Sequence, residues 1–148
     1  MAEPRGCTNL KLRQISRVLT RHYAGFVAPM GLKITQYSLL SYIVKLGPVG
    51  AGELAAAMRM EASTLTRNLQ PLVQQGWVEV ARGDDARSRI VQATAAGRAL
   101  RVQGQRAWKR AQLALNERLG AQRVAALHDL IDDCIALLDS AQEEAEDV

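Results

Sequence analysis

Hydrophobic residues recur at helical spacing at both ends of the chain. Near the N-terminus, between residues 8 and 27, they are separated alternately by three and four positions. The residues in this series are Leu12, Ile15, Leu19, His22 and Phe26. A seam with this spacing is typical of a helix that packs on another helix. We expect Thr8 to cap this helix at its start, and Pro29 and Gly31 to end it.

A second helix is predicted over residues 35–45, with Thr35 as its N-cap. The glycine-rich linker that follows, over residues 47–52, has no preceding strand and no Gly-Lys-Ser/Thr sequence. It therefore lacks the features of a phosphate-binding loop, and we interpret it as a flexible turn.

Residues 54–75 have the pattern of two short helices joined by a tight turn. At about 100° per residue, the second of these helices has one apolar side and one polar side. The apolar side carries Leu65, Leu69, Leu72 and Val73, and the polar side carries Ser63, Thr64, Arg67 and Gln70. Glu61 occupies the N-cap position, where Glu is a weak cap. Because Pro71 removes the hydrogen bond to the carbonyl of Arg67, we predict a bend or a break there.

Gly76 is placed to end this helix in a left-handed cap. Residues 77–80 and 89–93 are rich in β-formers and flank a loop with a Gly-Asp turn, which predicts a β-hairpin. Arg82, Arg87 and Arg89 lie in or beside this loop. We expect the Asp85 carboxylate to hold the guanidinium of Arg87 by a charge-assisted hydrogen bond.

A helix, a turn, a second helix and a hairpin, in this order, make up a winged helix-turn-helix. The polar side of the second helix suits the DNA major groove, where Arg67 can contact guanine in a bidentate manner. The hairpin arginines suit phosphates or the narrow minor groove. Two plainer interpretations stay open: the polar side is the solvent face of a surface helix, and the hairpin loop is simply a charged loop.

The C-terminal third of the chain is helical again. Thr94 is expected to cap a helix over residues 95–119, and Gly120 separates it from a last helix over residues 121–142. The last helix has a seven-residue apolar repeat, widened by two further leucines. These residues are Val124, Leu127, Ile131, Cys134, Leu138 and Ala141, with Leu130 and Leu137.

Apolar seams at both ends of the chain suggest that the termini pair in an intertwined homodimer, although both seams can also pack within one subunit. A helix of 25 residues reaches ~37 Å. Such helices can hold two winged domains ~34 Å apart, which is the separation of successive major-groove half-sites.

The charge distribution supports a polyanionic partner. The net charge is +4, with five basic and one acidic residue in 1–31, eight and five in 32–99, and six and nine in 100–148. The basic excess thus includes the proposed DNA-binding region. No apolar run approaches the ~20 residues that cross a membrane, and the first residues lack the apolar segment of a signal peptide. We expect a cytoplasmic protein.

Six short motifs then follow one another in an ordered set, at residues 32–40, 53–55, 63–67, 75–78, 85–87 and 94–97. In this order and near-spacing, the chain resembles the MarR family of bacterial transcriptional regulators over roughly residues 10–142. The resemblance implies a homodimer that binds a pseudo-palindromic operator, usually as a repressor, and is released by a small ligand or by cysteine oxidation. It also implies that Ser63, Thr64 and Arg67 contact bases, and that Asp85 and Arg87 belong to the wing.

Two switches are compatible with this resemblance. If the termini pair across a dimer, Cys7 and Cys134 can approach each other between subunits, which is similar to the two-cysteine hydroperoxide sensors of the family. Alternatively, Cys134 is a small hydrophobe on the apolar seam. The second switch is a ligand crevice, implied by the resemblance, between the dimer helices and the winged domain.

Four residues cluster in sequence near that crevice: His22, Tyr23, Phe26 and Tyr37. They would suit a small phenolic or carboxylate effector, and ordinary aromatic packing explains them equally well. The two cysteines and two histidines lack zinc-site spacing, and no nucleophile–base pair is recognisable. We therefore expect no metal, no cofactor and no enzymatic activity.

The sequence thus predicts a mainly α-helical winged helix-turn-helix with a small β-hairpin wing. We divide it into an N-terminal dimerisation helix (1–31), a DNA-binding domain (32–98) and C-terminal dimerisation helices (99–148). The predicted function is that of a homodimeric, sequence-specific DNA-binding transcriptional regulator. The alternative is a winged-helix protein interaction module that binds no DNA.

Overall fold

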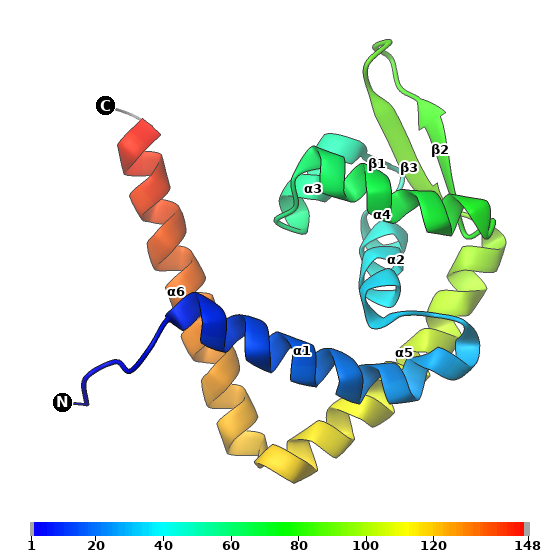
Figure 1. Cartoon of the computed structure of the whole chain (residues 1–148). Coiled ribbons are helices and arrows are strands. Elements are labelled where there is room, and N and C mark those ends of the chain that lie inside the picture. Colours follow the sequence, from blue (N-terminus) through cyan, green and yellow to red (C-terminus); the bar gives the residue numbers. More distant parts are fainter. Residues whose placement is uncertain (1, 147–148) are drawn as a thin grey trace. The chain divides into compact units, whose positions relative to one another are not determined.

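The computed structural model describes residues 2–146, so that the outermost ends of the predicted dimerisation segments, residues 1 and 147–148, lie outside the described part (Figure 1). The elements in chain order are α1 (Thr8–Val27), the 3₁₀ helix η1 (Ala28–Met30), α2 (Ile34–Leu46), β1 (Val49–Gly50), α3 (Ala51–Ala57), α4 (Ala62–Gln74), β2 (Val78–Arg82), β3 (Arg89–Ala93), α5 (Ala95–Leu119) and α6 (Ala121–Glu146). They form two compact units, 1–110 and 111–148. The predicted winged helix-turn-helix is confirmed.

The sheet has three antiparallel strands in the order β1-β3-β2. The predicted hairpin is present, with β2 and β3 paired from Val78↔Ala93 to Arg82↔Arg89. Figure 1 shows this hairpin extending away from the neighbouring helices, with α4 beside its base. The prediction of a flexible turn over residues 47–52 was wrong in two respects, because Val49 and Gly50 pair with β3 and because α3 already begins at Ala51. Two residues are too few to show a strand period, and only their partner strand defines them as β.

The core of the first unit joins α2, α3 and α4 to the inner face of the sheet. Its buried residues are Leu39, Leu40, Ile43, Val49, Leu54, Ala55, Leu65, Leu69, Leu72, Val78, Val91 and Ala93. Three leucines of α4 are among them, and Leu72 is fully buried. Fully burying a leucine contributes roughly 1.5–3 kcal/mol. These three side chains therefore fix which face of α4 turns inward.

Helix α4 continues through Pro71 without a break, so the predicted break was wrong. Proline cannot donate to the carbonyl of Arg67, but its own carbonyl still accepts from the N–H of Gln75 at 3.1 Å. Leu69 and Leu72 anchor the helix on both sides of the proline. Their burial offsets the missing hydrogen bond and keeps the last turn helical.

The ends of the helices follow the sequence only in part. Gly76 follows the end of α4 as the predicted left-handed cap: its φ is +76°, and the N–H of Trp77 donates to the carbonyl of Leu72 at 3.0 Å. Glu61 is the N-cap of α4 and makes no side-chain capping bond, as expected. Thr8 and Thr35 lie inside their helices, so these two cap predictions were wrong. The N-caps are Cys7 and Lys33, so the preference of threonine for caps placed the start of α1 one residue too late and the start of α2 two residues too late.

At the start of α2, Lys33 is the N-cap, and its N–H donates to Oε1 of Gln36 at 2.9 Å. Thr94, in contrast, caps α5 as predicted, because its Oγ1 accepts from the N–H of Gly97 at 3.1 Å. The same hydroxyl donates to the carbonyl of Gly76 at 2.6 Å. Thr94 therefore joins the end of α4 to the start of α5.

Helix α5 lies close to the rest of the first unit because two of its residues are glycines. A Cβ on Gly97 would lie 2.0 Å from the carbonyl oxygen of Trp77, and one on Gly104 would lie 2.7 Å from Cδ2 of Tyr37. Neither position has room for a side chain. Gly120, with φ of +88°, ends α5 and separates it from α6, as predicted.

We predict opposite effects for two Gly→Ala substitutions in helices. Gly97→Ala should lower the free energy of unfolding by about 1–3 kcal/mol, because the methyl group meets backbone atoms that cannot yield. Gly25→Ala, in α1 with nothing within 4 Å, should raise it by about 0.5–1 kcal/mol. Urea unfolding at one fixed protein concentration measures both values. Equal stability of the two variants would contradict the close approach of α5 to Trp77.

Candidate nucleic-acid interface

The polar side of α4 is exposed along its length. Ser63, Arg67 and Gln70 are exposed and Thr64 is half-buried, while the leucines on the opposite side are buried. The Arg67 guanidinium reaches Oγ1 of Thr64 at 3.5 Å, which is a long hydrogen bond. Because this hydrogen bond is weak, the guanidinium can donate to another acceptor. The four residues predicted to contact DNA from this helix thus lie on one accessible surface.

The turn before α4 sets the direction of this surface. Arg59 adopts a left-handed backbone conformation, with φ of +54°, and the N–H of Met60 donates to the carbonyl of Ala55 at 2.8 Å. A non-glycine residue in this region is uncommon. The tight turn brings α4 across the end of α3, as expected of a helix-turn-helix.

The wing carries its three arginines exposed. Arg82 and Arg89 face each other as the last pair of the β2–β3 ladder. Like charges directly opposite each other across two strands are destabilising. An anion at this position would remove that repulsion, which is the electrostatic situation expected at a nucleic-acid contact.

Arg89 is also held in place by the loop. Its Nη1 donates to the carbonyls of Ala86 and Ser88 at 3.3 and 3.2 Å. A guanidinium has five N–H donors, so the remaining donors can bind another group. Fixing the side chain in advance lowers the entropy that a contact with DNA would cost.

Asp85 organises the wing loop through the backbone. Its carboxylate accepts from the N–H of Arg87 at 3.3 Å, so the predicted bond to the Arg87 guanidinium was wrong. The hydroxyl of Ser88 donates to the Asp85 carbonyl at 2.8 Å and accepts from the Asp85 N–H at 3.1 Å. An Asx turn of this kind is the local bond that Asp forms most readily, and it leaves the guanidinium of Arg87 outside this hydrogen bond.

The four residues of the predicted ligand crevice divide between two environments. His22 contacts Tyr23 and Phe26 on α1, with ring centroids 5.4 and 5.5 Å apart, and partial burial raises the pKa of the Tyr23 phenol. Tyr37 is 6% exposed and packs with Val27, Leu32 and Ala107. Phe26 lies against that same cluster. Tyr37 is thus a packed core residue, as the plainer interpretation of these aromatics predicts.

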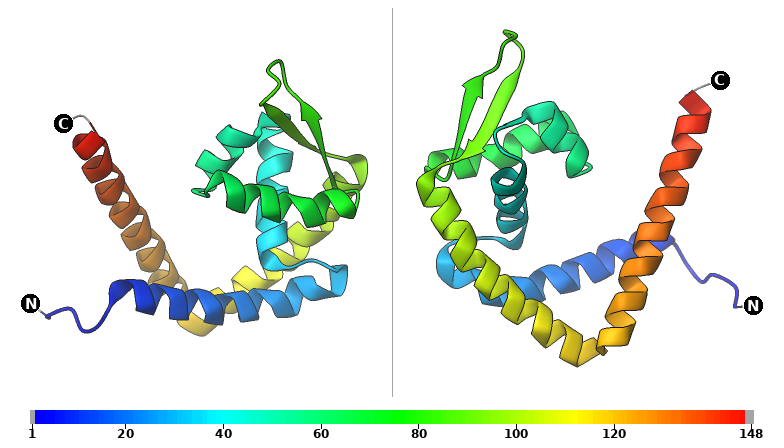
Figure 2. Two further views of the ribbon diagram at one scale, coloured as in Figure 1. Left: turned by 45° about the horizontal axis from the view of Figure 1, so that its top comes forward. Right: turned by 180° about the vertical axis from the view of Figure 1, so that it is seen from behind.

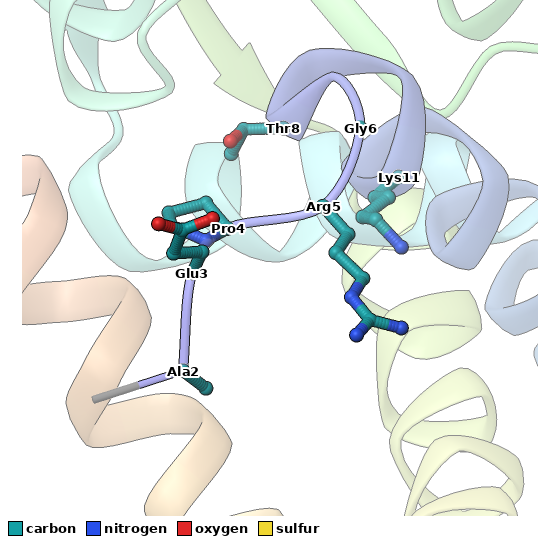
Figure 3. Close-up of a pocket in the computed structure, with 7 residues that line it drawn as sticks. All are labelled: Ala2, Glu3, Pro4, Arg5, Gly6, Thr8 and Lys11. Carbon is teal, nitrogen blue, oxygen red and sulfur yellow. The ribbon is translucent and has the colours of Figure 1, made fainter.

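Both cysteines are exposed and unbonded, Cys7 as the N-cap of α1 and Cys134 within α6. A hollow of about 750 Å³ lies beside Cys7 in sequence and is lined by residues 2–6, 8 and 11 (Figure 3). Figure 3 shows Arg5 and Lys11 on the same side of this bend. Because one short segment makes all of its walls, we interpret the hollow as the inside of a chain bend. Its two cationic residues, Arg5 and Lys11, lie two and four positions from Cys7 in the sequence.

The comparisons with known proteins agree with this geometry. A model of the MarR family matches residues 30–88. The crystal structure of the M. tuberculosis transcriptional regulator MOSR in complex with DNA is 32% identical to this chain, covers 87% of it and 98% of its own length, and has a TM-score of 0.72. The chain belongs to the MarR family.

Two further relatives extend this result. A mutant MarR from E. coli complexed with operator DNA is 24% identical, covers 85% of this chain and 91% of its own, and has a TM-score of 0.76, which shows the common fold. The uncharacterized HTH-type transcriptional regulator YwoH of Bacillus subtilis (strain 168) is 30% identical over 81 residues, or 55% of this chain. This match spans 59% of the YwoH chain.

Two apolar residues beside the candidate interface are more exposed than the sequence predicts. Val80, on the wing, is 39% exposed, and Val73, assigned above to the apolar side of α4, is 42% exposed. Their exposure depends on the distance between the wing and α4, which a local sequence pattern does not indicate.

Across residues 2–146, no helix combines the length and apolarity that spanning a membrane requires.

We predict that Asp85→Ala loosens the wing loop. Loss of the carboxylate acceptor should speed hydrogen exchange of the Arg87 amide about tenfold, as expected for a lost hydrogen bond of about 1.4 kcal/mol. Asp84→Ala, at the neighbouring exposed carboxylate, is the matched control and should leave that amide unchanged. Identical exchange in the two variants would show that Asp85 does not hold the loop.

Proposed function

We propose that this protein is a homodimeric, sequence-specific DNA-binding transcriptional regulator that acts in the cytoplasm as a repressor. The observation that carries the proposal is the exposed polar side of α4 beside a wing with three exposed arginines. The DNA complex of its relative MOSR, similar over nearly the whole chain, supports it. In this proposal α4 enters the major groove of a pseudo-palindromic operator.

We assign different roles to the two sets of side chains. Ser63, Thr64, Arg67 and Gln70 meet base edges, with Arg67 as the guanine contact. Arg82, Arg87 and Arg89 contact phosphates or the minor groove, and Asp85 shapes the loop that presents them. This division predicts that mutations in the two sets have different effects on sequence preference.

A homodimer is supported by the apolar residues that one chain leaves exposed. On α1, Leu12 and Val18 are each 51% exposed, and on α6, Leu130, Leu137 and Leu138 are 62–71% exposed. Large apolar groups in such number mark an interaction surface. We propose that residues 1–31 and 99–148 form the dimer, with residues 32–98 as the DNA-binding domain between them.

Two substitutions test DNA binding. Arg67→Ala should weaken binding to the cognate site by about 1–3 kcal/mol and relax sequence preference, because a bidentate base contact is lost. Arg82→Ala should weaken binding to all sequences alike and reduce the salt slope by about one contact. Fluorescence anisotropy on the DNA upstream of the protein's own gene, and on random duplex, measures both effects.

The result that would overturn this assignment is an equal loss for Arg67→Ala on cognate and random DNA. Absence of binding by the unmodified protein at any salt concentration would favour the protein interaction module instead.

We propose two alternatives for the release of DNA. In the first, a hydroperoxide oxidises the thiols of Cys7 and Cys134 to one disulfide between subunits, and the peroxide is reduced to an alcohol and water. In the second, a small phenolic or carboxylate effector binds near His22, Tyr23, Phe26 and Tyr37. The exposure of both cysteines supports the first alternative, and the packing of Tyr37 means that the second requires the cluster to open.

The redox alternative predicts that a hydroperoxide abolishes DNA binding and that dithiothreitol restores it. Cys7→Ser and Cys134→Ser should each bind DNA normally and be insensitive to the peroxide, because a disulfide needs both thiols. Non-reducing electrophoresis would then show a covalent dimer of the unmodified protein alone. Peroxide-insensitive binding by the unmodified protein would leave the effector alternative.

A further inference from the structure

A hollow of about 280 Å³ lies between α4 and the wing, within the first unit. Its lining includes Thr66, Leu69, Gln70 and Val73 of α4, and Val80 and Arg89 of the wing. We call it the α4–wing trough. Figure 2 shows, from two sides, that α4 lies beside the base of the hairpin. Its volume falls just below the ~300–1,000 Å³ of typical small-molecule pockets.

The α4–wing trough combines apolar, cationic and amide groups. Its floor is apolar, with Val73 and Val80 each about two-fifths exposed. Arg89 lines one side, held by the carbonyls of Ala86 and Ser88. Gln70 supplies a neutral amide on the α4 side. Apolar surface beside a cation and an amide donor suits a ligand that has both hydrocarbon and an anionic oxygen.

DNA geometry identifies such a ligand at this position. In B-DNA the major and minor grooves are separated by a sugar–phosphate strand, so a helix in one groove and a wing at the next must straddle that strand. The α4–wing trough is the space between this helix and this wing. A deoxyribose offers hydrocarbon and its phosphate offers anionic oxygens.

We propose that the α4–wing trough seats one sugar–phosphate strand of the DNA, with deoxyribose against Val73 and Val80 and a phosphate bound by Arg89. This inference rests on the DNA binding proposed above. The occupied trough sets the depth at which α4 enters the groove, while Val73 and Val80 carry no sequence information. The anion also relieves the repulsion between Arg82 and Arg89 at the end of the ladder.

The first test couples Arg89 to a phosphate. Anisotropy is measured on the duplex from upstream of the protein's own gene, with neutral methylphosphonates placed at one backbone position at a time. The unmodified protein should lose roughly tenfold in affinity at the seated phosphate, as expected for a charge-assisted bond. Arg89→Ala should bind unmodified DNA with the same roughly tenfold lower affinity. A methylphosphonate at the seated phosphate should not lower the affinity of this variant further. Arg87→Ala, the control on the same loop, should remain sensitive there.

The second test places charge on the trough floor. Val73→Glu, Val73→Gln and Val73→Lys have similar size, so differences in affinity among them report the charge of the occupant. Glu should weaken binding at least tenfold relative to Gln on cognate and random DNA alike, and Lys should strengthen it. Circular dichroism before and after heating establishes that all three are folded.

Three results would overturn the proposal. In the first, the unmodified protein binds DNA, but Arg89→Ala loses affinity at the same methylphosphonate positions as the unmodified protein does. This result would leave the proposed function intact. Another is equal affinity of the Val73 variants. The third is a shift of the Val73 and Val80 methyl resonances on titration with salicylate but not with the duplex, which would assign the trough to a small acid. If the unmodified protein binds no DNA at all, the proposed function itself fails.

Discussion

The hydroxyl of Thr94 holds together the elements that present the candidate interface. It donates to the carbonyl of Gly76, where α4 has just ended, and accepts from the N–H of Gly97 in the first turn of α5. The N–H of Thr94 donates to the carbonyl of Trp77 at 3.0 Å, at the base of the wing. One residue thus joins the connection between α4 and β2 to the first turn of α5. Gly97 makes this possible, because a larger residue would collide with the Trp77 carbonyl.

The two faces of α4 are made by different forces. Burial of Leu65, Leu69 and Leu72 fixes the inner face and holds the helix together through Pro71. The outer face carries polar side chains, and Ser63, Arg67 and Gln70 among them are exposed. On the wing, Arg82 and Arg89 lie opposite each other as the last pair of the ladder. The repulsion between these two arginines destabilises the wing, and a bound polyanion would offset it.

Tyr37 and Trp77 connect the winged helix-turn-helix to α5. Tyr37 of α2 packs against Gly104 and Ala107 of α5, and Trp77 packs against both apolar clusters of the unit. An effector inserted at Tyr37 would have to separate α2 from α5. Because Thr94 caps the start of α5, such a separation would strain the junction that supports α4 and the wing.

The sequence determined the elements whose signal is local or periodic. The seams of the outer helices, the two sides of α4, the Gly76 cap, the Thr94 cap and the β2–β3 hairpin all follow from spacing and from backbone preference. These features require only contacts within a few residues, or burial of one whole side of a helix. For the same reason the exposed polar side of α4 can be predicted from the sequence alone.

Only the tertiary structure decided the features that depend on a distant partner. β1 exists because β3 lies beside it, and Pro71 is tolerated because buried leucines on both sides outweigh one lost hydrogen bond. Asp85 bonds a backbone amide because the loop closes through Ser88. The α4–wing trough depends on the distance between two elements, which neither segment encodes alone. Local sequence sets what each segment prefers, and long-range packing selects which preference prevails.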